Sequence, residues 1–130
     1  MPIVHIRSLA LPNAIDMPSL LDKLAHAFAQ QAKIQLEHIS IEWHYTQPGH
    51  FFVNQQVHHK QQAHQPPIMV ELFVPDVHSE KRQQQLISLL AKVIHQHSHI
   101  ALDNIFVSLR VAQSGSIFDD GRIVTWPKKG

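Results

Sequence analysis

The feature that most constrains this sequence is an internal duplication with an offset of 66 residues. The turn residue Gly49 has a counterpart in Gly115 at this offset. Apolar residues recur in the same way, with Val4, Ile6, Ile39, Ile41 and Trp43 matching Val70, Leu72, Ile105, Val107 and Leu109. Self-similarity of this kind indicates two copies of one supersecondary unit. At 130 residues, the chain is long enough for the two copies to share one core.

The first copy has the pattern of a strand, a helix and a second strand. Apolar residues alternate with polar ones over 2–8 and again over 39–46, which predicts two strands with one apolar face each. Between them, apolar residues at helical spacing predict an amphipathic helix over about 17–33. Asp16 can cap this helix, and Pro18 is tolerated in its first turn.

The second copy repeats this order. Alternation predicts strands over 68–74 and 105–111, and Ser79 can cap the helix that lies between them. The two copies are joined by the polar, low-complexity segment 54–66, in which no hydrophobic face can be drawn. We expect this segment to be a surface loop or a short ribbon.

Together these patterns predict an α+β fold, an α/β two-layer sandwich. Right-handed crossovers make the two strands of each unit parallel, so two units side by side give a four-stranded sheet with both helices on one face. We expect a single domain over 1–130, with a first unit at about 2–53, a second at about 67–118 and a C-terminal tail at 119–130. The sheet face away from the helices would carry Phe73 and Phe106 among polar residues, which favours contact with another subunit.

Composition and charge exclude several classes of function. The formal net charge of +1 gives no basic footprint for nucleic acid. With no cysteine, the chain has no disulfide, zinc thiolate, iron–sulfur cluster or cysteine nucleophile. No apolar run reaches the roughly 20 residues of a membrane helix, and residues 1–7 do not resemble a signal peptide. We therefore expect a cytoplasmic protein without nucleic-acid or membrane partners, and, with no glycine-rich phosphate loop, without a cofactor.

Histidine is unusually frequent, with 12 residues. On a helix, His95 and His99 would share one face and could chelate a metal, while His97 would point away. No acidic residue stands at ligand spacing beside them. We therefore predict no native metal site and interpret the histidines as a compositional bias.

The start of the chain and its duplicated pattern resemble the tautomerase superfamily. The resemblance rests on Met1-Pro2-Ile3 opening a strand, on the duplicated strand-helix-strand unit, and on the segment from Gly49 to Phe51 after a second strand. It implies that Met1 is removed and that Pro2 is the catalytic base in keto–enol tautomerisation of a small carbonyl acid. It also implies a homotrimer. An apolar pocket would lower the pKa of the prolyl amine and leave it neutral at working pH.

The resemblance also implies a cation that holds the carboxylate of the substrate. The superfamily's binding arginine matches Ser40 in the first unit and Phe106 in the second. Arg110 lies on the same strand and face as Phe106, so it is the leading candidate. Phe106 and Ser108 fall where a tyrosine and an asparagine line the site in macrophage migration inhibitory factor.

Six further candidates have alternative interpretations. Arg7 can bind a carboxylate or form an ion pair with Glu42 or Glu71, either between strands or between subunits. Lys33 resembles a binding lysine of the superfamily, but a cation at a helix C-terminus is also favoured by the macrodipole. Phe51, like Phe118 and Trp126, can line an apolar pocket or pack between subunits. Arg122 follows a turn near the chain end and can lie over the site of a neighbouring subunit, or it can be a solvated residue beside that turn.

Two functions of different classes follow from this sequence. The first is a trimeric tautomerase that uses Pro2. The second is a non-catalytic trimeric scaffold or small-ligand-binding protein with the same fold. The mass of the purified chain shows whether Met1 has been removed. The tautomerase requires its removal, because retained Met1 blocks the Pro2 nitrogen, whereas the binding protein does not.

Overall fold

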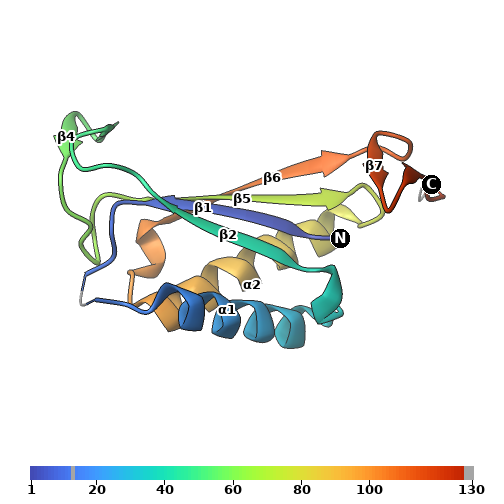
Figure 1. Ribbon diagram of the computed structural model, residues 1–130, viewed down its shortest axis with the longest axis horizontal. Helices are drawn as coiled ribbons and strands as arrows, with labels where there is room; N and C mark the ends of the chain where they lie inside the picture. Colours follow the sequence, from blue (N-terminus) through green and yellow to red (C-terminus); the bar gives the residue numbers. More distant parts are fainter. Residues whose placement is uncertain (13, 128–130) are drawn as a thin grey trace.

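The structure is a computed structural model that describes residues 1–12 and 14–127. Its main sheet has four strands in the order β2-β1-β5-β6, with β1 and β5 antiparallel at the centre and parallel pairs on either side. Both helices cover the same face of this sheet (Figure 1). These elements are β1 (Ile3–Ser8), α1 (Met17–Ala32), β2 (Ser40–Tyr45), β5 (Ile68–Pro75), α2 (Glu80–Ser98) and β6 (Ile105–Ala112).

The duplication is visible in the pairing of the strands. Ile3 pairs with Ser40 and Ile68 pairs with Ile105, in both cases the residue 37 positions later. In the central antiparallel pair, His5 stands opposite Glu71, its own counterpart at the 66-residue offset. These two residues therefore mark a pseudo-twofold axis that relates the units. The predicted two-layer α+β fold with a duplicated unit is confirmed.

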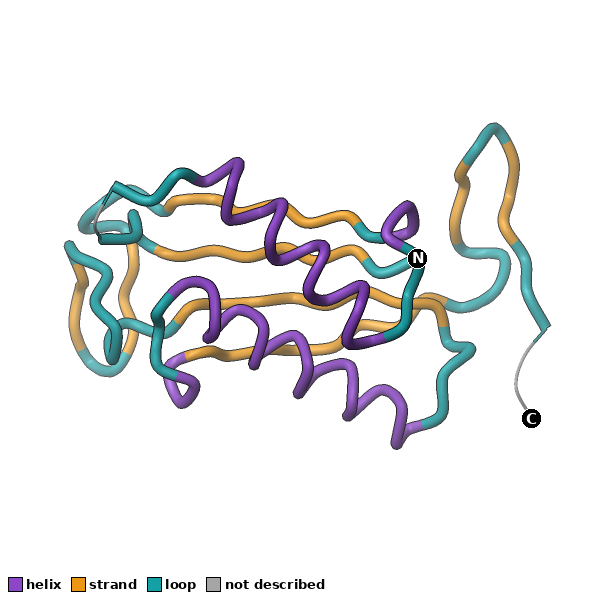
Figure 2. The backbone as a smooth tube through the Cα atoms, turned by 90° about the horizontal axis from the view of Figure 1, so that it is seen from below, coloured by secondary structure: helices purple, strands orange, loops and turns teal. Residues whose placement is uncertain are grey.

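Each unit also ends in a small hairpin. The hairpins are β3 (Phe51–Val53) with β4 (Gln56–His58), and β7 (Ile117–Asp119) with β8 (Arg122–Val124). Their turns contain positive-φ pairs, Asn54 and Gln55 in one and Asp120 and Gly121 in the other, as two-residue hairpin turns require. The repeat thus continues beyond residue 118, and the polar segment after Val53 contributes a short ribbon. Figures 1 and 2 show the hairpins at opposite ends of the sheet.

The core lies between the helices and the sheet. Alternate residues of the central strands point toward the helices, because successive side chains of a strand face opposite sides. Each fully buried aliphatic or aromatic side chain contributes roughly 1.5–3 kcal/mol. The largest fully buried side chains include Ile6, Leu24, Phe28, Leu72, Leu86, Leu90 and Ile94. Short 3-10 turns, Leu36–His38 and Leu102–Asn104, lead from each helix into the next strand.

A buried hydrogen bond joins the two strands of the first unit. The indole Nε1–H of Trp43 donates to Ser8 Oγ at 2.9 Å. We expect Ser8→Ala to lower the free energy of unfolding by about 1–3 kcal/mol, because the buried indole N–H loses its acceptor. Urea unfolding measures this loss, with Trp43→Phe as the background for comparison. An equal loss in both backgrounds would contradict a role for the hydrogen bond.

The sheet face without helices is called the open face below. Its side chains form three rows of four across the strands. The mixture of aromatic and charged residues on this face agrees with the sequence prediction. The rows are Ser40, Ile3, Phe73 and Arg110 at one end, then Glu42, His5, Glu71 and Ser108, and finally His44, Arg7, Met69 and Phe106.

Neither α1 nor α2 has the length and apolar character that crossing a membrane requires, and the described residues contain no other candidate span.

Candidate active site

Pro2 lies at the buried start of β1. Its side chain is buried, whereas Met1 retains 38% of its exposure. The carbonyl of Pro2 accepts a hydrogen bond from the Ser40 N–H at 3.0 Å, which fixes the residue against β2. Burial lowers the pKa of the Met1 amino group through desolvation. If Met1 is removed, the amine moves to Pro2, one residue further into the fold.

The row of the open face beside Pro2 contains a possible carboxylate-binding cation. Arg110 stands in the same row as Ile3, with Phe73 between them. Because neighbouring strands lie about 4.8 Å apart, the backbones of Arg110 and Ile3 are roughly 10 Å apart. The Arg110 side chain is 69% exposed, and its Nη2 lies 3.7 Å from Glu71 Oε1. This weak surface contact leaves the guanidinium accessible.

Most other predicted binding residues are not at this end. Arg7 is four residues beyond Ile3, or about 13 Å along β1. Phe106 shares the row of Arg7, and Phe51 lies beside the same end of the sheet. Ser108 stands in the middle row, opposite Glu71. The structure therefore places Arg110 in the row of Ile3, the residue after Pro2, and places Arg7 and Phe106 two rows further along the sheet.

Within one chain, the described residues show no ion pair of Arg7 with Glu42 or Glu71; a pair between subunits stays a prediction. The carboxylate of Glu42 lies 2.6 Å from His44 Nε2 and 3.9 Å from His5 Nε2, and Glu71 contacts Arg110. Both glutamates stand in the middle row, one row away from Arg7. The alternating pattern identified the face of Arg7 correctly but could not give its row.

Lys33 ends α1 in a left-handed conformation, with φ of 57°, and its backbone N–H donates to the Ala29 carbonyl. The chain then passes through a 3-10 turn to Ser40, the partner of Pro2. The exposed Lys33 thus lies at the Pro2 end of the molecule, in the helix layer rather than on the open face.

The Pro2 end also contains two hydrogen bonds of Trp126 that were not predicted from the sequence. The Trp126 Nε1–H donates to Asp76 Oδ1 at 2.7 Å, and the Trp126 backbone N–H donates to Ser114 Oγ at 2.8 Å. These bonds hold the chain after β8 against the end of β5. Figures 1 and 2 show the β7–β8 hairpin, which carries Phe118 and Arg122, at the same end as the N-terminus. Asp76 directly follows β5, which is antiparallel to β1, so it must lie beside the start of β1. This strand order is the signal that could have predicted its position.

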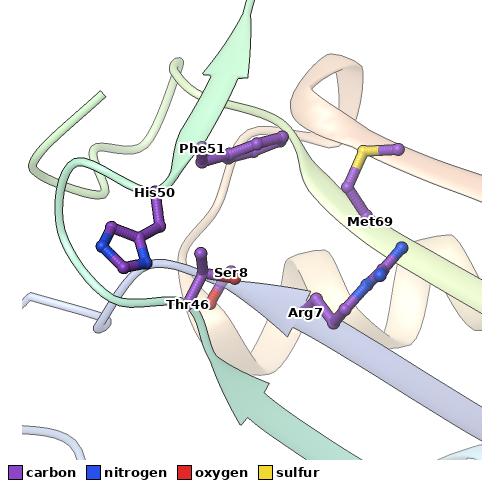
Figure 3. A pocket seen from close by; sticks show the side chains of 6 residues that line it. All are labelled: Arg7, Ser8, Thr46, His50, Phe51 and Met69. Atoms are coloured by element: carbon purple, nitrogen blue, oxygen red, sulfur yellow. The ribbon is translucent and has the colours of Figure 1, made fainter. Parts of the chain in front are cut away.

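A cavity of about 250 Å³ lies at the opposite end of β1. Figure 3 shows its side chains around one space: Arg7 and Met69 from the central strands, and His50 and Phe51 from the approach to β3. Ser8 and Thr46 complete the lining. Sequence reasoning selected Arg7 and Phe51 but missed Met69 and Thr46, and it used His50 only as part of a motif.

The histidines of the second helix do not form the suggested chelating pair. His95 Nδ1 donates to the Ile100 carbonyl at 2.6 Å. His99 lies beyond the last residue of α2 and is left-handed, with φ of 64°, so it does not continue the helical face. Within 1–12 and 14–127, no three histidine or acidic residues are grouped in a way that could hold a metal ion.

Comparison with known proteins gives structural likeness without close sequence relatives. No family model matches the chain, and no curated protein matches it. Among solved structures, Pt0534 inactivated by 2-oxo-3-pentynoate is 20% identical, with a TM-score of 0.77 and 94% of each chain covered. A wild-type fused 4-OT, described as a symmetric trimer, is 12% identical, with a TM-score of 0.77 and 94% of each chain covered.

The chain has the tautomerase fold. Malonate semialdehyde decarboxylase shares this fold at 15% identity, with a TM-score of 0.63 and 93% of each chain covered. At these identities the likeness concerns the backbone rather than the site. The tautomerase fold explains why the duplicated units, the central antiparallel pair and the two helices occur together in one chain.

Proposed function

We propose that this protein is a cofactor-independent tautomerase in which Pro2, freed by removal of Met1, is the base. The observation that carries the proposal is the buried position of Pro2 at the start of β1 in a tautomerase fold. The desolvation that acts on the Met1 amine supports it, because the same surroundings would disfavour a prolyl ammonium. A neutral secondary amine is then available near working pH.

The proposed reaction is a proton transfer in a small carbonyl acid. The Pro2 lone pair takes the enol proton of the substrate, and the carbonyl bond forms as the carbon–carbon double bond is broken. The resulting ammonium returns a proton to the carbon, so the base is regenerated and nothing is oxidised or reduced. The exposed guanidinium of Arg110 is suited to hold the substrate carboxylate. Lys33 is a second cation at the same end.

The proposed assembly is a homotrimer. Phe106 on the open face is 53% exposed, and the hairpin residues Phe52 and Phe118 are exposed as well. Burial of these rings against other copies would remove a large apolar area from water. The fused 4-OT neighbours are trimers, which supports the same arrangement for this chain.

The second candidate function is that of a non-catalytic ligand-binding protein with this fold. It is favoured by Ser40, which stands where the superfamily resemblance places an arginine, and by the contact of Arg110 with Glu71. Mass spectrometry followed by an assay with phenylenolpyruvate and 2-hydroxymuconate decides between the two functions. Turnover by the processed chain supports the enzyme, whereas a processed chain with no turnover supports the binding protein.

We expect Arg110→Ala to raise KM more than it lowers kcat. A charge-assisted contact to the substrate contributes about 1.5–3 kcal/mol, so kcat/KM should fall roughly 10- to 100-fold. The change should appear mainly in KM, because the carboxylate is held equally in the ground and transition states. Arg7→Ala is the matched control, since it removes an arginine from the other end of the same face. Unchanged KM in Arg110→Ala would assign carboxylate binding to another residue.

A further inference from the structure

We propose that the cavity beside Arg7 is a second ligand site, which binds a small organic carboxylate with a flat apolar body and does not transform it. This inference does not depend on the proposed reaction at Pro2, because it uses residues at the other end of β1. The cavity is lined by Arg7, Ser8, Thr46, His50, Phe51 and Met69 and is called the Arg7 cavity below.

The duplication relates the Arg7 cavity to the Pro2 end. At the 66-residue offset, Arg7, Thr46 and His50 correspond to Phe73, Ala112 and Ser116. The local structure repeats as well, since the N–H of Gly49 and that of Gly115 donate to the equivalent carbonyls of His58 and Val124, both at 3.0 Å. The two ends thus share a backbone but differ at these three positions: a phenylalanine, an alanine and a serine at the Pro2 end replace the arginine, threonine and histidine of the Arg7 end.

The Arg7 end cannot carry out the chemistry proposed for Pro2. The residue that corresponds to Pro2 is Ile68, the first residue of β5. Its nitrogen lies inside the chain as a backbone amide, which has no basic lone pair. A free prolyl amine is therefore absent from this end, and the proposal for the Arg7 cavity is one of binding.

Within the described part of one chain, the guanidinium of Arg7 has no acidic partner. Arg7 and Met69 share the row of Phe106, so in the proposed trimer a neighbouring copy would border this cavity. Among the described residues, no carboxylate forms a salt bridge with Arg7, because the nearby glutamates are engaged by His5, His44 and Arg110. Figure 3 shows the Arg7 side chain directed toward Met69, with Thr46 and His50 further away on the other side of the lining. A guanidinium can bind a carboxylate through two parallel hydrogen bonds, and the hydroxyl and imidazole across the cavity are further donors.

The remaining walls select the body of the ligand. Phe51 and Met69 offer an aromatic face and a thioether, which contact flat apolar groups well. The volume of about 250 Å³ lies just below the usual range of ligand pockets, which begins at about 300 Å³. A single ring with one carboxylate suits this space, and inorganic anions would leave the apolar walls unused.

The β3–β4 hairpin, which contributes Phe51 to the cavity, is held together by hydrogen bonds within the hairpin and the turn before it. The His58 carbonyl accepts from the Gly49 N–H at 3.0 Å, and the His58 ring contacts the Val53 carbonyl through Nε2, also at 3.0 Å. The rings of His58 and Phe51 are 6.5 Å apart. Phe51 is thus held against its hairpin partner His58, which limits the motion of this wall within the hairpin.

The test is a calorimetric and NMR titration with benzoate. We expect Arg7→Gln to weaken benzoate binding at least tenfold and Lys23→Gln, which removes an exposed cation of α1, to leave it unchanged. Protein that retains Met1 should bind benzoate as well as processed protein, because the site needs no free amine. This last result separates the inference from the proposed tautomerase, which Met1 would block.

Further variants and ligands make the inference refutable. Phe51→Ala should weaken benzoate, and Arg7→Lys should bind with intermediate affinity if Arg7→Gln proves poorly folded by circular dichroism. Equal binding of neutral benzamide would show that charge is not recognised, and equal binding of inorganic phosphate would show that the apolar walls are not used. Loss of benzoate binding in Arg110→Gln but not in Arg7→Gln would move the site to the Pro2 end. Equal binding of benzamide or of phosphate, loss of binding only in Arg110→Gln, or absence of benzoate binding would each overturn the inference.

Discussion

Protein that retains Met1 should show no tautomerase activity with phenylenolpyruvate, whereas the processed chain should turn it over. The retained residue converts the Pro2 nitrogen into an amide, which has no basic lone pair. Pro2→Ala in processed protein should lose most of the rate but keep some, because alanine offers a primary amine of different geometry and basicity. The order of the three rates, measured on samples whose N-terminus is verified by mass, tests the mechanism.

The same mechanism predicts the sign of the pH dependence. The base must be neutral to accept a proton, so the rate should rise with pH through the pKa of the Pro2 amine. Burial lowers the pKa of the Met1 amino group, and the amine of processed Pro2 would lie one residue further into the fold. We therefore expect the rise in rate to lie below the ordinary pKa range of an N-terminal amine. Full activity in the Met1-blocked chain would show that turnover arises elsewhere, and Pro2 would lose its assigned role.

A change of Phe106 to aspartate should convert a trimer into monomers. In the proposed assembly this ring is buried between copies, and an unpaired charge in that position is strongly disfavoured. We expect the mass measured by light scattering at micromolar concentration to fall to one third. Leu36→Asp is the matched control, because Leu36 is a similarly exposed apolar residue in the turn after α1, away from the open face.

The wild-type measurement can refute the assembly by itself. A stable monomer at micromolar concentration would mean that the open face is not covered by other copies. It would also leave the Pro2 end without the neighbouring subunit that the superfamily resemblance implies.

The sequence predicted the fold well because both of its signals are local or periodic. Alternation at Val4 and Ile6 and helical spacing around Leu24 each depend on one face being buried, and the duplication repeats both signals. The hairpin formed by β7 and β8 was not predicted as strands, since its three-residue strands are too short to show a period. Only its turn, at Asp120 and Gly121, was visible.

The site was harder to predict because it depends on distances along and between strands. Arg7 and Arg110 share a face, and nothing local separates them. Only the register shows that Arg110 stands in the row of Ile3 while Arg7 stands two rows away. The Arg7 cavity likewise requires the β3–β4 hairpin to fold beside the end of β1, a contact between segments that the sequence does not specify by any motif.

The pairing of His5 with Glu71 across the pseudo-twofold axis has an evolutionary consequence. If each unit were a separate chain, a symmetric dimer would place the same residue type on both sides of this axis, because isologous contacts repeat each position. A mutation would then alter both halves at once. Covalent linkage of the units removes that restriction, so a basic and an acidic residue can face each other here. The same freedom allows one end of the sheet to specialise while the other acquires a different task.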